Sequence, residues 1–166
     1  FWISNNTGLD EVARTFRKPL LLMNVAPLMS LTHEIAQKKR LICMKPHINS
    51  KNKKLSLSEI FEYGVADSFR GGDFKKKKVK LKEHNPQQIK NIVLEMLKLM
   101  RDSWKIKNKK DIELQRKFKK LYLKKMKEFH STLHYLSEIS YSDLAYRKLK
   151  IIYSMSFLKK NRWFLH

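Results

Sequence analysis

The first quarter of the chain alternates short apolar runs with polar breaks, which is the pattern of a compact β–α–β unit. Residues 1–4 (FWIS) form a short strand pattern, and residues 5–8 (NNTG) break it. Residues 20–25 (LLLMNV) are continuously apolar, which is typical of a strand buried on both faces of a parallel sheet. Between them a short helix is predicted, with Leu9, Val12, Ala13 and Phe16 as its apolar positions.

The middle of the chain has fewer regular patterns. Residues 26–54 are irregular except for one short apolar strand pattern at residues 41–44. Ser56 and Glu59 have the spacing of a capping box, so a helix starts there, and Gly64 ends it. Residues 71–73 (GGD) indicate a turn, and the Lys-rich residues 74–81 suit either a basic edge strand or an exposed loop.

From Asn85 onward the pattern is helical. Asn85 is a helix cap, with Pro86 in the first helical position and Gln88 in the third. A four-turn apolar stripe follows, consisting of Ile89, Ile92, Val93, Met96, Leu97, Met100 and Trp104. A second helix is predicted at residues 111–129, with Leu114, Phe118, Leu121, Tyr122 and Phe129 on one side, and a third at residues 142–159, with Ala145, Leu149, Ile152 and Met155.

The formal net charge of +22 raises the question of a polyanionic partner. A strongly basic chain suits nucleic acid or an anionic membrane surface. However, much of the lysine falls on the outward faces of predicted helices, and no base-reading motif is present. We therefore expect nucleic acid not to be the partner, while a basic module that binds nucleic acid or a membrane without catalysis is the alternative function.

Other features of the sequence bear on the redox compartment of the protein, on membrane spans and on the length of the whole polypeptide. Cys43 is the only cysteine, so an internal disulfide is excluded, a reducing compartment is favoured, and a buried, inert thiol is expected. No run of about 18 apolar residues is present to span a membrane. The chain begins at Phe1 inside a strand pattern, so we expect it to be the later part of a longer protein.

Residues 6–8 (NTG) are the candidate for binding chemistry, because they lie between a strand and a helix. The first amides of a helix have no partner within it, and the helix dipole is positive at that end, so an anion binds there readily. Gly8 would let a phosphate approach the backbone closely. By spacing alone, however, an ordinary cap is the better explanation, with Thr7 as the N-cap and Asp10 in the third position.

The order of several short motifs resembles a family of bacterial glycosyltransferases linked to surface-carbohydrate biosynthesis. The resemblance begins in FWISNNTGLDEVARTFRKPLLLMNVAP and continues through LSLSEIFEYG, HNPQQIKNIVLEML and the C-terminal SMSFLKKNRWFL, so it extends along nearly the whole chain. The matching residues are Phe1, Thr7, Gly8, Phe16, Lys18, Pro19, Asn24, Pro27, Leu55, Ser58, Glu59, Ile60, Gly64, Asn85, Pro86, Ile89, Glu95 and Met96. Thr7 replaces the commoner Ser, and residues 28–54 diverge.

The resemblance implies an α/β fold, namely the Rossmann-like C-terminal half of a GT-B fold followed by a long helical C-terminal region. Residues 1–84 would bind the nucleotide-sugar donor, and residues 85–166 would pack on them or on the missing N-terminal half. Asn6, Thr7 and Gly8 would bind the donor phosphate, with Asn24 and the weaker candidate Glu59 near the sugar or nucleotide. The sequence identifies no catalytic residue.

The resemblance also implies how such an enzyme would work. It would transfer a sugar from a nucleotide-sugar to a polysaccharide or lipid-linked acceptor without a metal or other cofactor, since amides and cations stabilise the leaving phosphate. It would be cytoplasmic, with an anionic inner membrane surface as a further partner. This chain alone would be inactive, because in such folds the base that activates the acceptor usually comes from the other half.

Overall fold

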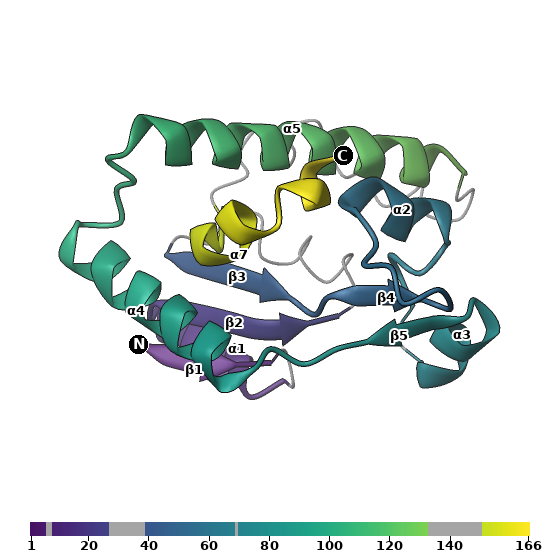
Figure 1. The fold of residues 1–166 in the computed structure, drawn as a ribbon. Helices are drawn as coiled ribbons and strands as arrows, with labels where there is room; N and C mark the ends of the chain where they lie inside the picture. Colours follow the sequence, from purple (N-terminus) through teal and green to yellow (C-terminus); the bar gives the residue numbers. More distant parts are fainter. Residues whose placement is uncertain (6–7, 27–38, 69, 133–150) are drawn as a thin grey trace.

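The computed structural model describes residues 1–5, 8–26, 39–68, 70–132 and 151–166, and it shows a mixed α/β protein built on a parallel sheet (Figure 1). Four strands form this sheet in the order β1-β2-β3-β6, and each neighbouring pair is parallel. The strands are β1 (Trp2–Ser4), β2 (Leu20–Val25), β3 (Arg40–Met44) and β6 (Ile152–Tyr153). The predicted strands at residues 1–4, 20–25 and 41–44 are therefore confirmed.

The two central strands form the core of the sheet. In β2 every residue except Asn24 is buried, and all five residues of β3 are buried, including Cys43 as expected. The burial of residues 20–23 and 41–44 agrees with their apolar sequence, because helices cover both faces of a parallel sheet. The buried guanidinium of Arg40 instead donates to the Lys18 carbonyl at 3.0 Å. The edge strand β1 differs, since only its last residue, Ser4, is buried.

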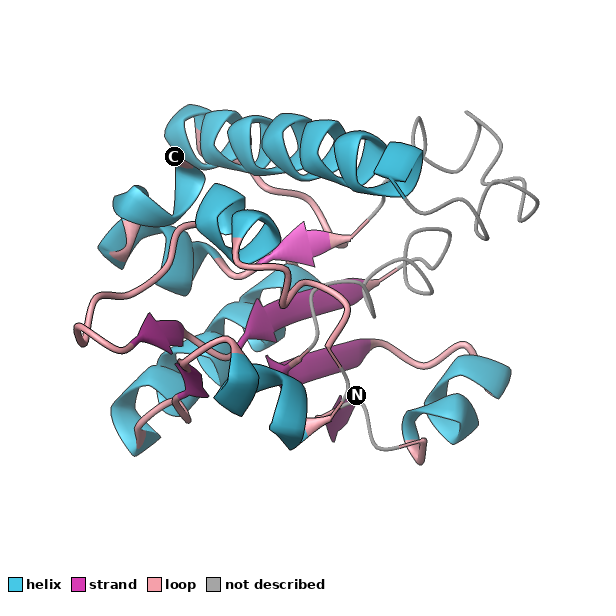
Figure 2. Ribbon diagram, turned by 90° about the vertical axis from the view of Figure 1, so that its right-hand side faces the viewer, coloured by secondary structure: helices cyan, strands magenta, loops and turns pink. Residues whose placement is uncertain are grey.

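Helices lie on both faces of the sheet (Figures 1 and 2). The short helix α1 (Asp10–Thr15) packs beside β1 and β2 on one face, and α4 (Pro86–Arg101) and α7 (Met155–Lys160) lie together on the other. The long helix α5 (Lys109–Thr132) runs along the β6 side and packs against α2 (Leu57–Glu62), α7 and β6. A short 3₁₀ helix, η3 (Arg162–Leu165), follows α7 and packs against α2 and α5.

A smaller antiparallel pair lies beyond the carboxyl end of β3. It consists of β4 (His47–Asn49) and β5 (Val79–Leu81), with α2 and α3 (Gly71–Lys76) between them in the sequence (Figure 1). His47 is buried here and its ring contacts Phe74 of α3. Burial lowers the pKa of His47 to about 4, although the hydrogen bond to the Lys45 carbonyl opposes this shift.

Both predicted helix starts with a capping box are confirmed. Ser56 Oγ accepts from the Glu59 amide at 3.3 Å, and Glu59 Oε2 accepts from the Ser56 amide at 2.8 Å. In α4, Asn85 Oδ1 accepts from the Gln88 amide at 2.9 Å, and Gln88 Oε1 accepts from the Asn85 amide at 2.8 Å. These contacts involve residues three apart, which is why the sequence was sufficient to predict them.

The prediction for residues 71–81 was wrong in its first half. Instead of a turn, Gly71–Lys76 forms the helix α3, and only Val79–Leu81 is a strand. Two features favour this helix over the expected turn. Asp73 lies in its first turn and Lys75 and Lys76 in its last, which suits the helix dipole, and Phe74 is buried against the neighbouring pair of strands.

The predicted helix at residues 142–159 was only partly right among the described residues, because residues 155–159 are helical and residues 151–154 are not. Ile152–Tyr153 is the strand β6, and the helix α7 begins only at Met155; Ala145 and Leu149 lie outside the described residues. The three residues 151–153 (IIY) are all buried, as suits branched and aromatic side chains in a sheet. The C-terminal region is therefore not entirely helical, because one of its segments completes the sheet.

Candidate functional site at the carboxyl ends of the strands

An open pocket of about 410 Å³ lies at the carboxyl ends of β1 and β2. Its described lining consists of Trp2, Ile3, Ser4, Asn5, Leu9, Met23 and Asn24. Three of these residues are polar and none is charged, and Trp2 provides an aromatic surface. Ligands of open α/β sheets bind at this edge, so the pocket is the candidate site.

The turn before α1 is shaped by a carboxylate of the protein itself. Asp10 is buried, and its Oδ1 accepts from the Gly8 amide at 2.9 Å and from Ser4 Oγ at 3.4 Å. Its Oδ2 lies 2.7 Å from the guanidinium of Arg14, one helical turn away. The Gly8 amide, which we predicted to bind a donor phosphate, is therefore bonded to Asp10 in this structure.

The helix α1 begins two residues later than the capping-box alternative requires. Its N-cap is Leu9 and no side chain caps it, so Asp10 is the first helical residue rather than the third. Asp10 consequently reaches back to Gly8, whose φ of +90° is readily adopted only by glycine. Asn6 and Thr7, the other predicted phosphate ligands, lie outside the described residues.

Asn24, which the resemblance implied to lie near the sugar or nucleotide, lines this pocket at the end of β2. Its φ is +53°, and the register of β2 against β3 shifts between Leu22 and Val25, so the backbone is irregular at this point. Asparagine tolerates this left-handed conformation better than most residues. Its Oδ1 also accepts from the His84 amide at 3.2 Å, so Asn24 both lines the pocket and holds the segment that precedes α4.

Glu59 does not line this pocket. Its carboxylate accepts from the Ser56 amide and also pairs with Lys53 Nζ, so it closes the cap of α2. The hydrogen bonds from Lys53 and from the Ser56 amide lower its pKa below the ordinary value. These contacts account for Glu59 as a helix cap.

Behind the site lies a buried contact between a cysteine and a histidine. His84 Nε2 is 3.1 Å from Cys43 Sγ and 2.9 Å from the Met44 carbonyl oxygen. Burial raises the pKa of Cys43 well above its ordinary value and lowers the pKa of His84. Both shifts favour the neutral forms, so this pair is not an activated thiolate and a packing role accounts for it.

A second group of hydrogen-bond donors lies directly after β6, and sequence patterns did not indicate which residue accepts from it. Glu95 of α4 accepts from the Met155 amide at 2.7 Å, from the Ser156 amide at 2.9 Å and from Ser154 Oγ at 3.0 Å. About sixty residues separate Glu95 from these donors. No periodicity or short-range spacing relates residues so far apart.

Within the part of the chain that the structure describes, no cluster of three or more His, Cys, Asp or Glu residues could hold a metal ion. None of the described helices is long and apolar enough to cross a membrane. No protein-family model, curated protein or solved structure matches the chain.

Proposed function

We propose that this chain is the donor-binding part of a glycosyltransferase that transfers a sugar from a nucleotide-sugar to a surface-polysaccharide or glycolipid acceptor. The observation that carries the proposal is the pocket at the carboxyl ends of β1 and β2, in the region where the motif resemblance is densest. In an open parallel sheet this is the edge at which nucleotides bind. The GT-B arrangement of two such halves is part of the same proposal.

The chemistry of the lining supports a sugar or nucleoside ligand. Asn5 and Asn24 offer amide groups that can pair with ligand hydroxyls, and Trp2 offers a face on which a ring can stack. A phosphate that reaches the Gly8 amide would compete with the Asp10 carboxylate, so donor binding at this turn would displace Asp10. The catalytic base would come from the other half.

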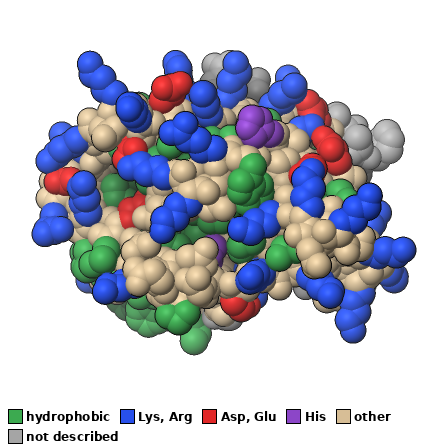
Figure 3. All heavy atoms as spheres, viewed as in Figure 1, with side chains coloured by type: hydrophobic (Ala, Val, Ile, Leu, Met, Phe, Trp, Pro, Cys, Tyr) green, Lys and Arg blue, Asp and Glu red, His purple; other side chains and the backbone are tan. Residues whose placement is uncertain are grey.

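The distribution of charge gives the alternative function no specific support. Lys and Arg side chains are spread over the whole face in Figure 3 and are interspersed with Asp and Glu. Several described lysines are paired with acids, including Lys45 with Glu83 and Lys159 with Asp111. A nucleic-acid or membrane surface gathers its cations in a patch.

The test is calorimetric titration of the full-length gene product with a panel of nucleotide-sugars. We expect one of them to bind, and the Leu9→Glu substitution to weaken it about tenfold or more, because the new carboxylate repels the donor phosphates. Leu9 is 67% exposed and lines the pocket, so the change disturbs little packing.

Ile112→Glu is the matched control, because Ile112 is 49% exposed on α5 and does not line this pocket. It should leave the affinity within about twofold, as expected for a distant surface charge screened by salt. If none of the nucleotide-sugars binds, or if Leu9→Glu binds as tightly as Ile112→Glu, the proposed function is wrong.

A further inference from the structure

We infer that the outer edge of β1 pairs with a further parallel strand from the rest of the same polypeptide, which closes the open side of the pocket. This inference rests on the proposed function for the identity of the polypeptide. The pairing itself is argued from the hydrogen-bonding groups, the exposed side chains and the strand order of the sheet.

The hydrogen-bonding groups of β1 point in two directions. The Trp2 amide donates to the Pro19 carbonyl at 2.9 Å, on the β2 side. Successive amides of a strand point to opposite sides, so the Ile3 amide points to the outer edge. A further strand placed there would continue the ladder in which Trp2, Ile3 and Ser4 already pair with Leu20, Leu21 and Leu22.

The opposite edge of the sheet shows how this protein closes an edge. At β6, the buried side chain of Gln115 imitates a neighbouring strand: its Nε2 donates to the Tyr153 carbonyl at 2.5 Å, and its Oε1 accepts from the Tyr153 amide at 3.1 Å. The helix α5, which carries Gln115, packs over the same strand. Among the described residues, no comparable side chain is seen at β1.

The residues around β1 are also apolar where an exposed edge is usually charged. Residues 1–4 contain no charged residue and no proline, although these are the features that protect a free edge from pairing. Phe1, Trp2 and Ile3 are exposed, as are Leu9, Val12 and Phe16 of the predicted stripe on α1, where only Ala13 is buried. Hydrophobic side chains accordingly gather in the lower left of Figure 3, where β1, α1 and α4 lie.

The strand order indicates that the partner strand is parallel. From β1 the sheet proceeds in one direction only, through β2 and β3 to β6, and all pairs are parallel. A parallel partner would continue this order beyond β1, and the pocket at the carboxyl end of β1 would then lie between β2 and that strand. A second copy of the chain would instead pair antiparallel, because a twofold axis reverses the strand.

The first test is hydrogen exchange of single amides in the full-length gene product. We expect the Ile3 amide to exchange about 100-fold or more slowly than an open amide, comparably to the Trp2 amide in the same strand. An Ile3 amide that exchanges freely while Trp2 is protected would overturn the inference. Protection that disappears on dilution would also overturn it, because the partner would then be a second copy.

The second test uses proline, which is tolerated in an edge strand only where its missing N–H faces solvent. We expect Ile3→Pro to lower the melting temperature of the full-length product by at least about 5 °C relative to Ile3→Ala, which keeps the N–H. Equal melting temperatures would contradict the pairing. Both readouts are independent of nucleotide-sugar binding, so the inference and the proposed function can fail separately.

Discussion

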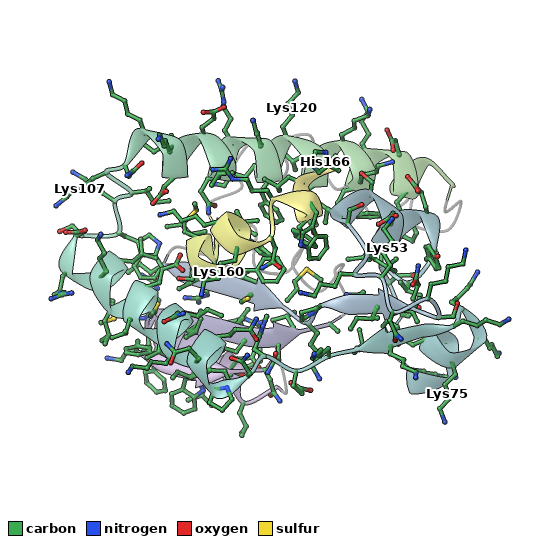
Figure 4. All side chains as sticks on the ribbon, viewed as in Figure 1. Lys53, Lys75, Lys107, Lys120, Lys160 and His166 are labelled. Atoms are coloured by element: carbon green, nitrogen blue, oxygen red, sulfur yellow. The ribbon has the colours of Figure 1, made fainter. Side chains whose placement is uncertain are left out.

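Two strands of the sheet end in groups of hydrogen-bond donors, and each group binds a carboxylate of the protein. After β1, Asp10 accepts from Gly8 and Ser4, which are two and six residues away. After β6, Glu95 accepts from Ser154, Met155 and Ser156, about sixty residues away. Glu95 is half-buried and, with Met155 and Ser156, lines a pocket of about 390 Å³ where α4 and α7 lie together (Figure 4), and the β1 end opens on the pocket of about 410 Å³.

The difference shows two uses of the same backbone chemistry. Amides at the start of a helix favour an anion whatever its source. Glu95 uses this preference to hold the C-terminal segment 154–156 against α4, which fixes the place of β6 in the sheet. Asp10 uses it within one turn, beside a pocket, where an external anion could take its place. The remote carboxylate joins two distant segments of the chain, whereas the local one acts within its own turn at the candidate site.

The largest expected effect is that of removing the remote carboxylate. Glu95→Ala leaves the three donors of residues 154–156 without their acceptor, so we expect the free energy of unfolding to fall by about 3 kcal/mol. Urea denaturation at neutral pH measures this change. Glu113→Ala is the control, since Glu113 makes one exposed pair with Lys117 and should cost less than about 0.5 kcal/mol. Equal losses for the two variants would contradict the structural role of Glu95.

The local carboxylate should matter less for stability and more for ligand binding. Asp10→Asn keeps an oxygen that can accept from Gly8 but loses the charge that faces Arg14, so we expect a loss of about 1–2 kcal/mol in the free energy of unfolding. The same substitution should tighten the binding of a nucleotide-sugar, because the competing negative charge is gone. Denaturation and calorimetric titration measure the two effects. A variant that is less stable and also binds more weakly would show that Asp10 does not compete with the donor.

The sequence was informative for several contacts between groups close along the chain, although not for the turn expected at residues 71–73. The capping boxes of Ser56 and Asn85 were predicted because their partners lie three residues away. The buried strand at residues 20–25 was predicted because its residues are almost all apolar. Asp10 was also expected at this turn, but as the third helical residue rather than the first. Glu95 could not be placed, because its partners are brought close only by the sheet.

The apolar periodicity of the sequence gave wrong predictions where the burial of a side chain depends on elements that are distant along the chain. The apolar spacing of residues 9–16 correctly predicted a helix but not the face it buries. Among its apolar positions only Ala13 is buried, and the other buried residue of the helix is Asp10. Ile152 and Met155 have helical spacing, yet Ile152 lies in β6 because β3 offers a free edge to pair with. A pattern of apolar residues shows that a surface is to be covered but not which element covers it.

The smallest effect concerns a third carboxylate on helix amides, Glu59 in the cap of α2. Its folded-state pKa is lower than its ordinary value, so its contribution to stability is present above the ordinary pKa and is lost as the pH falls through the lowered one. We expect the stability gap between the wild type and Glu59→Gln to be smaller than the effect of Asp10→Asn, because Glu59 is partly exposed. The gap should be constant near neutral pH, begin to close as the pH falls to the ordinary glutamate pKa of about 4.3, and close fully only below the lowered folded-state pKa, where both side chains are uncharged. Denaturation of both proteins from pH 7 to pH 3 measures this stability gap, and taking the difference cancels the protonation of His47, whose pKa of about 4 falls in the same range.

A gap that widens in acid would mean that the carboxylate destabilises the helix start, and the rule that helix amides favour any nearby carboxylate would then fail at the simplest of the three sites.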